Sequence, residues 1–198
     1  ALHDLKPIQG SNSWAISPSK STTGRAILAN DPHLGLSTPA IWYENHLHCP
    51  ELQVTGVTIA GSPLVLIGHN ERIAWGVTLA FTDCEDVFME TFKDYSCKKY
   101  KYEGKWLPSK VINEKITIKG KDRPYEKEII YTKHGPIVSE VADYPEKRIA
   151  LQSMALLPKQ NFLQAWWQLN LAKNWADFGN ALSFMTAPQL NISYADVA

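Results

Sequence analysis

The sequence of 198 residues contains 20 Lys and Arg residues against 20 Asp and Glu residues, so its formal net charge at pH 7 is zero. This balance gives no electrostatic reason to expect a nucleic-acid partner, and no apolar run is long enough to span a membrane. The length permits a domain with a real core and therefore permits an enzyme.

From residue 14 to about residue 154 the pattern predicts a β-rich region. Short β-branched or aromatic runs alternate with Gly, Pro, Asn and Asp turns, which is typical of antiparallel hairpins and meanders. The runs lie at 26–30, 54–59, 63–69, 74–79, 87–92, 115–119, 128–132 and 148–154. The run at 63–69, PLVLIGH, is apolar on both faces, so we expect its sheet to be covered on both sides. The wet, basic stretch at 98–110 predicts a surface hairpin.

Near residue 162 the period changes, and apolar residues recur at steps of three and four. This spacing predicts two helices that meet near Lys173. Asn174 is expected to cap the second helix, Asp177 suits its first turn, and Pro188 is expected to close it. The final residues, QLNISYADVA, show strand-like alternation up to the last position, and we therefore expect the chain to be a piece of a larger protein.

The sequence contains several blocks that agree in order with one enzyme family. A Gly10–Ser11 pair is ordinary loop sequence by itself. With its surroundings it begins a series of blocks: GSNSWAISPSKSTTGRAILANDPHLGL, GHNERIAWGVTLAFTDCED, KHGPIV, LAKNWADF and SYADV. The series resembles the start of the catalytic β chain of penicillin acylases, which are N-terminal-nucleophile hydrolases, and the resemblance extends from Gly10 nearly to the end of the chain.

The resemblance implies an α+β fold that forms part of a four-layer αββα sandwich, antiparallel and β-rich, with two helices near the C-terminus. Residues 1–10 would be the end of a linker or propeptide, and residues 11–198 would be the N-terminal part of the β-chain domain. The missing α chain and the remainder of the β chain would be its partners. Family members are mostly exported, which implies a periplasmic or extracellular location.

By the same resemblance Ser11 is the nucleophile, and cleavage after Gly10 uncovers it. In such enzymes the precursor cuts itself, and the new α-amine acts as the base for the serine hydroxyl. A hydroxyl needs such a base at neutral pH, and an α-amine has a pKa of about 8. In the printed sequence the Ser11 amine is bonded to Gly10, so we expect this form to be inactive.

Two more residues would complete the reacting centre. The backbone N–H of Leu79 would hold the oxyanion, together with a family asparagine that lies beyond this chain. His33 falls where relatives place a Gln or His beside the nucleophile and would position the serine or the substrate, although a lone histidine is more often a satisfied loop residue. His69, Asn70 and His134 are interpreted as structural hydrogen-bonding residues at turns.

A calcium site is a further implication. Asp83 and Asp86 match calcium-binding positions of the family, with the carbonyl of Glu85 between them, and hard oxygen ligands suit this ion. Two acids at this spacing are more commonly a solvated loop, and the other family ligands lie outside this chain. No organic cofactor is implied.

The acyl pocket is assigned by the same resemblance. For each single residue the ordinary alternative is that it belongs to the hydrophobic core. The aligned positions are all apolar, as a site for an acyl chain or ring should be. They are Leu34, Leu66, Ile67, Val77, Trp166 and Leu190. Relatives act on phenylacetyl or phenoxyacetyl amides, glutaryl side chains or fatty acyl homoserine lactones. The absence of Arg or Lys from the six positions favours an aromatic or aliphatic acyl group over a dicarboxylic one.

The preferred hypothesis is an amide hydrolase that removes an acyl group from a small amine such as a β-lactam nucleus. A second hypothesis keeps the fold without the chemistry, as a β-rich binding or scaffolding module. A third, a lectin-like β-sandwich, would explain the seven Trp residues but not the sequence blocks.

Overall fold

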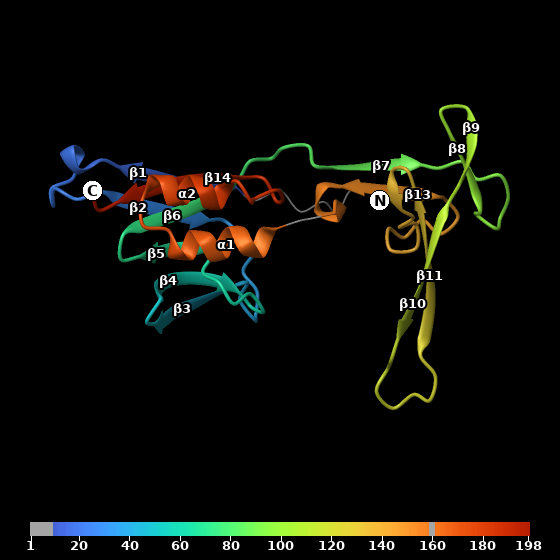
Figure 1. Ribbon diagram of the computed structural model, residues 1–198, viewed down its shortest axis with the longest axis horizontal. Helices are drawn as coiled ribbons and strands as arrows, with labels where there is room; N and C mark the ends of the chain where they lie inside the picture. The colour runs from blue at the N-terminus through green and yellow to red at the C-terminus, as the bar shows by residue number, and fades with distance from the viewer. Residues whose placement is uncertain (1–9, 159–160) are drawn as a thin grey trace. The chain divides into compact units, whose positions relative to one another are not determined.

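The computed structural model describes residues 10–158 and 161–198, which group into two units (Figure 1). The second unit extends from Asp83 to Pro158. The first unit combines the described residues before it, 10–82, with those after it, 161–198. The segment 11–198, expected as one portion of a domain, thus forms two units. Of the expected linker or propeptide, residues 1–9 lie outside the described residues.

A five-stranded antiparallel sheet with the order β14-β6-β5-β4-β3 organises the first unit. Its strands are β3 (Trp42–Cys49), β4 (Leu52–Ile59), β5 (Ile67–Asn70), β6 (Ile73–Leu79) and β14 (Leu190–Asp196). The predicted strand at 63–69 is shorter than expected, although Leu64, Val65 and Leu66 before it are buried as predicted. Strand β3 was not predicted, because an edge strand that carries Glu, Asn and His lacks a continuous apolar pattern.

Two helices lie against one face of this sheet, α1 (Phe162–Leu171) and α2 (Trp175–Leu182), as the spacing predicted (Figure 1). The Asp177 backbone N–H donates to Asn174 Oδ1 at 2.9 Å, which confirms the predicted cap. The prediction that Pro188 closes α2 was wrong. The helix ends earlier because Phe184 and Met185 donate to carbonyls three residues back instead of four. Neither described helix is long and apolar enough to cross a membrane.

The main core lies between the helices and the sheet. Trp75 of β6, Trp166 and Leu169 of α1 and Phe178 of α2 are at most 2% exposed. Asn170, also in this layer, satisfies the backbone of Val65 with its side-chain amide, through bonds of 3.0 and 2.8 Å. The helices are therefore held against the sheet by apolar packing, and the Asn170 amide also joins α1 to the backbone of Val65.

A two-stranded antiparallel sheet covers the other face, formed by β1 (Ser11–Ile16) and β2 (Ile27–Pro32), with the short 3₁₀ helix η1 (Pro18–Lys20) between them. Both strands contact β6 and β14. The first unit thus has helix, sheet and sheet layers, which are three layers of the expected αββα arrangement.

The second unit is built from hairpins. The long hairpin at its centre confirms a β-rich region, and the predicted surface hairpin at 98–110 is present as β8 and β9. Its elements are β7 (Glu85–Met89), β8 (Lys99–Tyr102), β9 (Lys105–Pro108), β10 (Lys110–Ile116), β11 (Tyr125–Thr132), β12 (Gly135–Pro136), β13 (Ile149–Ser153) and the 3₁₀ helix η2 (Met154–Leu156). The sheets are β10-β11-β12, β13-β7 and β8-β9.

Candidate active site

Ser11 is the first residue of β1 and lies opposite Pro32, the last residue of β2. The carbonyl of Gly10 accepts a hydrogen bond from the backbone N–H of His33 at 3.0 Å. The peptide bond that joins Gly10 to Ser11 is therefore held beside the residue that follows β2, and its carbonyl oxygen faces an N–H group.

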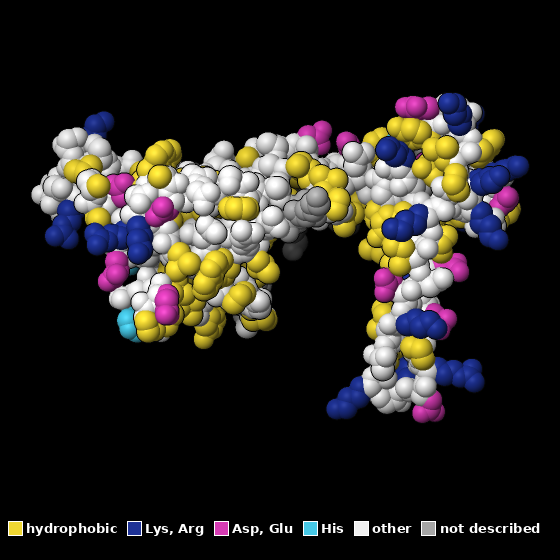
Figure 2. All heavy atoms as spheres, in the orientation of Figure 1, with side chains coloured by type: hydrophobic (Ala, Val, Ile, Leu, Met, Phe, Trp, Pro, Cys, Tyr) yellow, Lys and Arg dark blue, Asp and Glu magenta, His cyan; other side chains and the backbone are white. Residues whose placement is uncertain are grey.

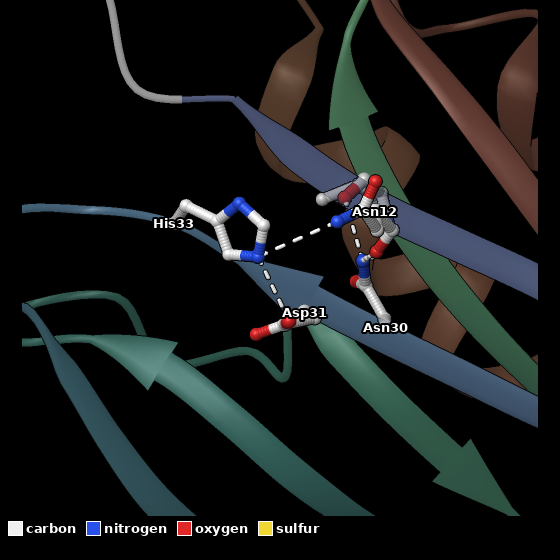
Figure 3. Close-up of polar contacts among 5 residues, drawn as sticks. Asn12, Asn30, Asp31 and His33 are labelled. Atoms are coloured by element: carbon white, nitrogen blue, oxygen red, sulfur yellow. Dashed lines mark hydrogen bonds and ion pairs between the residues drawn. The ribbon is translucent and has the colours of Figure 1, made fainter.

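His33 also makes side-chain contacts close to this bond (Figure 3). Its Nε2 lies 2.8 Å from Asp31 Oδ2 and 3.4 Å from the Asn12 side-chain amide. Since an ionised carboxylate only accepts, Nε2 carries the proton in the Asp31 contact and then cannot also accept a hydrogen bond from the Asn12 Nδ2. The His33 and Asp31 side chains are 45% and 65% exposed, so this pair orients the imidazole in solvent and contributes little to stability.

Strands β1 and β6 run in opposite directions across the layer interface. Gly76 approaches Ser13, since a Cβ on Gly76 would lie 2.7 Å from Ser13 Oγ. Asn12 is one residue before Ser13 in β1, and Val77 is one residue after Gly76 in β6. The side-chain amide of Asn30 bonds the carbonyls of both Asn12 and Val77. Because one step back in β1 matches one step forward in β6, Ser11 and the end of β6 lie at the same end of the two layers.

The backbone N–H of Leu79 faces an edge of β6 that β5 does not reach. Ala80 N–H bonds Gln189 in the β14 direction, and Arg72 accepts from Val197 on the same side, so even-numbered residues of β6 bond β14. Odd-numbered residues then face the β5 side. Since β5 pairs with β6 only at Ala74 and Trp75, the Leu79 N–H lies beyond the last pair on this side.

The six expected acyl-pocket residues fall into two groups. Leu66 and Trp166 belong to the buried core, and Val77 and Leu190 are partly buried against that core. Ile67 is buried outside this cluster, and Leu34 follows His33 with partial exposure. Four of the six positions therefore belong to, or pack against, the core of the first unit.

The three expected calcium ligands line a pocket of about 130 Å³ in the second unit, with Ser153 opposite Glu85. The Glu85 carboxylate accepts from Ser153 Oγ at 2.8 Å. Cys84 C=O accepts from Met154 N–H, so by ladder alternation the Glu85 carbonyl faces away from β13. Its oxygen and the exposed Asp83 and Asp86 carboxylates suit a hard cation, although three positions supply only part of the six to eight oxygens that calcium takes. The described residues contain no cluster of three or more His, Cys, Asp or Glu side chains placed to hold a metal.

The residues interpreted as turn hydrogen-bonding groups do have that role. Asn70 Oδ1 accepts from the N–H groups of Arg72 and Ile73 at 2.8 and 2.9 Å, at the turn between β5 and β6. His134, at the turn between β11 and β12, contacts Glu90 Oε1 through Nδ1 at 2.9 Å. Nδ1 of His69 lies 3.2 Å from the Asn70 carbonyl oxygen.

Sequence reasoning missed Asn12, Asn30 and Asp31, although all three lie in quoted blocks. Asn and Asp are depleted in strands, so their presence inside β1 and β2 was the available signal.

Comparison with known proteins gives a consistent result. The family model described as penicillin amidase matches residues 1–198. The acyl-homoserine lactone acylase QuiP of Pseudomonas fluorescens (strain Pf0-1) is 34% identical over 202 residues, covering 100% of this chain. Penicillin acylase 2 proenzyme of Pseudomonas sp. (strain SE83) is 33% identical over 66% of the chain, and penicillin G acylase of Escherichia coli is 33% identical over 94%.

The chain covers 24%, 17% and 22% of the length of these three relatives, respectively. Among solved structures, a thermostable penicillin G acylase from Alcaligenes faecalis superposes with a TM-score of 0.75 at 30% identity. That match covers 93% of this chain and 33% of the other. The β-rich architecture with two helices is therefore shared with that enzyme.

Proposed function

Because the chain belongs to the penicillin amidase family, we propose that it is the nucleophile-bearing part of a larger amide hydrolase, an acylase that exposes Ser11 by cutting itself. The observation that carries the proposal is the common position of Ser11 and the Leu79 N–H at one end of β1 and β6. One similar protein is named a proenzyme, which agrees with activation by cleavage.

In the proposed self-cleavage, Ser11 Oγ attacks the Gly10 carbonyl carbon. The new C–O bond replaces the C–N bond, and the serine nitrogen takes up the hydroxyl proton and becomes the free α-amine. Water then hydrolyses the ester, which releases Gly10 as a carboxylic acid and restores the Ser11 hydroxyl. The contact from His33 N–H to the Gly10 oxygen supports this step, because that N–H faces the atom on which negative charge develops.

In the mature site the Ser11 amine would take the proton of its own hydroxyl as the hydroxyl attacks an acyl amide. The Leu79 N–H would stabilise the tetrahedral oxyanion together with an asparagine outside this chain. The amine would return the proton to the leaving nitrogen, and water would release the acid. His33, aligned by Asp31, would position the nucleophile or the substrate.

We assign the acyl group to the apolar positions next to Leu79. Val77 lies two residues earlier on the same side of β6, and Leu190 lies opposite Leu79 on β14. Leu34, Leu66, Ile67 and Trp166 complete the proposed lining, which is uncharged. An aromatic or aliphatic acyl group fits this lining, and the names of the similar proteins suggest a homoserine lactone or a β-lactam nucleus as the amine.

A structural calcium ion is proposed at Asp83, Asp86 and the carbonyl of Glu85, with the other ligands from outside this chain. It would neutralise two carboxylates and brace the loop before β7. The proposed partners are an α chain and the remainder of the β chain, and the proposed location is the periplasm or the cell exterior.

The surface supports the proposal of further chains. Figure 2 shows hydrophobic side chains on the viewed face of the first unit, around β3 and β4. In this part of the sheet Ile41, Tyr43 and Ile59 are 38%, 66% and 44% exposed. Exposed apolar groups of this kind are typical of surfaces that another chain covers.

The proposed activity is tested on the complete protein that contains this segment. Hydrolysis of an acyl homoserine lactone and of penicillin G is measured for the wild type, for Ser11→Ala and for Ser17→Ala, whose exposed hydroxyl contacts only Ser19 among the described residues. We expect release of the acid by the wild type and Ser17→Ala, and none by Ser11→Ala. Full activity of Ser11→Ala would overturn the assignment of Ser11 as the nucleophile, and a folded wild type that only binds the compounds would favour the binding-module hypothesis.

A further inference from the structure

Asn30 of β2 satisfies the backbone of two other strands with one side-chain amide. Its Oδ1 accepts from Val77 N–H at 2.8 Å, and its Nδ2 donates to the carbonyls of Val77 at 3.0 Å and Asn12 at 2.8 Å. Both N–H protons and the oxygen are used, which fixes the orientation of the amide, because the rotated form would place its oxygen against two carbonyls.

The position of these bonds gives Asn30 its importance. Asn12 follows the proposed nucleophile directly, and Val77 lies two residues before Leu79, the proposed oxyanion donor. At Val77 the amide occupies the side of β6 where β5 has ended, so it takes the place of a missing neighbouring strand. The next N–H on that side belongs to Leu79.

We propose that Asn30 is a positioning residue that sets the nucleophile strand in register with the oxyanion donor. This inference rests on the proposed acylase function. Stabilisation of an oxyanion requires a donor about 3 Å from the developing charge, and a shift of about 1 Å in a reacting group costs about 100-fold in rate. Asn30 does not touch the substrate. It fixes the distance between Ser11 and the Leu79 N–H through its hydrogen bonds to the backbones of Asn12 and Val77.

Another asparagine provides a matched control. Asn70 also uses its whole amide on backbone groups, with Oδ1 on the N–H of Ile73 at the start of β6 and Nδ2 on the carbonyls of Asn170 and Ala172. Leu79 lies six positions after Ile73 along the strand, which is about 20 Å. Loss of the Asn70 amide removes the bond to the start of β6 and the two bonds to the end of α1, which is a comparable number of side-chain bonds at the opposite end of β6.

The experiment compares Asn30→Ala, Asn30→Asp and Asn70→Ala in the complete protein, using a phenylacetyl nitroanilide and an acyl homoserine lactone. Rates are divided by the fraction of chains that begin at Ser11, measured by mass spectrometry. Asn30→Asp has the shape of asparagine and keeps an acceptor for Val77 N–H but lacks both donors. A version whose Ser11 is exposed by an added site-specific protease supplies mature enzyme where a variant does not cut itself.

We expect both Asn30 variants to lose about 100-fold in kcat with an unchanged KM, and Asn70→Ala to keep the wild-type kcat. Asn30 variants with wild-type kcat, or an equal loss of kcat in Asn70→Ala, would overturn the positioning role while the acylase function stands. A wild type without activity on any acyl amide would overturn both proposals together.

Discussion

At the scale of single residues, Gly76 sets how closely the two sheets of the first unit approach. A Cβ at this position would lie 2.7 Å from Ser13 Oγ and 2.8 Å from Asn30 Cβ. The serine hydroxyl can rotate away, but the Asn30 Cβ is held by its backbone and by three hydrogen bonds of its amide. The short distance between the sheets therefore depends on the absence of a side chain at Gly76.

Replacement of this glycine should be costly. We predict that Gly76→Ala lowers the free energy of unfolding by about 1–3 kcal/mol, because the added methyl group overpacks the interface. Gly179→Ala is the control, since its Cβ would meet nothing within 4 Å and alanine is favoured in helices by about 1 kcal/mol. Urea unfolding measures both changes, and a neutral Gly76→Ala would show that the layers can separate without loss.

The residues of the candidate site were predictable only in part. Ser11, His33 and Leu79 were assigned through family resemblance, since a lone serine, histidine or leucine carries no signal of its own. The role of Asn30 depends on a contact with Val77, 47 residues away in the sequence, and no local pattern contains that information.

At the scale of elements, the helices and most strands followed from local physics. The spacing of apolar residues predicted α1 and α2, and the Asn174 cap was correct to the residue. Strand β3 was missed because its polar residues reflect a place at the sheet edge, which is a property of the assembled sheet. The predicted end of α2 was wrong because the backbone hydrogen bonds after Leu182 span three residues instead of four, which ends the helix before Pro188.

The contact between α2 and β14 includes a partly buried phenol, that of Tyr194. Tyr194 packs against Trp175 and Phe178, with ring centroids 5.1 and 4.7 Å away, and donates to Asp196 Oδ2 at 2.7 Å. Burial, followed by the Asp196 hydrogen bond, raises the pKa of Tyr194 above its usual value of 10.0. The folded state therefore holds the phenolic proton more tightly than the unfolded chain does.

The sign of the pH dependence follows from this direction. The stabilisation from protonated Tyr194 is fully present below about pH 10, the pKa of the unfolded chain's tyrosine. It is lost as the pH rises toward the raised pKa, because the unfolded chain then releases a proton that the folded chain keeps. We predict that Tyr194→Phe, which cannot ionise, loses stability less steeply above pH of about 10 than the wild type. Urea unfolding across this range measures the slopes, and identical slopes would contradict the assignment.

At the scale of the whole molecule, the chain spans 24% of the length of one similar acylase and forms two units. Exposed apolar side chains occur in both units, with Val87 and Met89 of β7 at 69% and 78% in the second. The sequence predicted the layered class of the fold through resemblance. It did not predict the division into two units, because hairpin signals do not state which hairpins pack together.

The proposed cleavage makes Ser11 a chain terminus, so the mass of the mature large chain tests the proposal. The complete protein is produced as wild type, Ser11→Ala and Ser17→Ala, and the N-terminus of each large chain is determined by mass spectrometry. We expect a large chain that begins at Ser11 in the wild type and in Ser17→Ala, and an uncut chain in Ser11→Ala. A wild-type protein that is folded and remains joined at Gly10–Ser11 would contradict it.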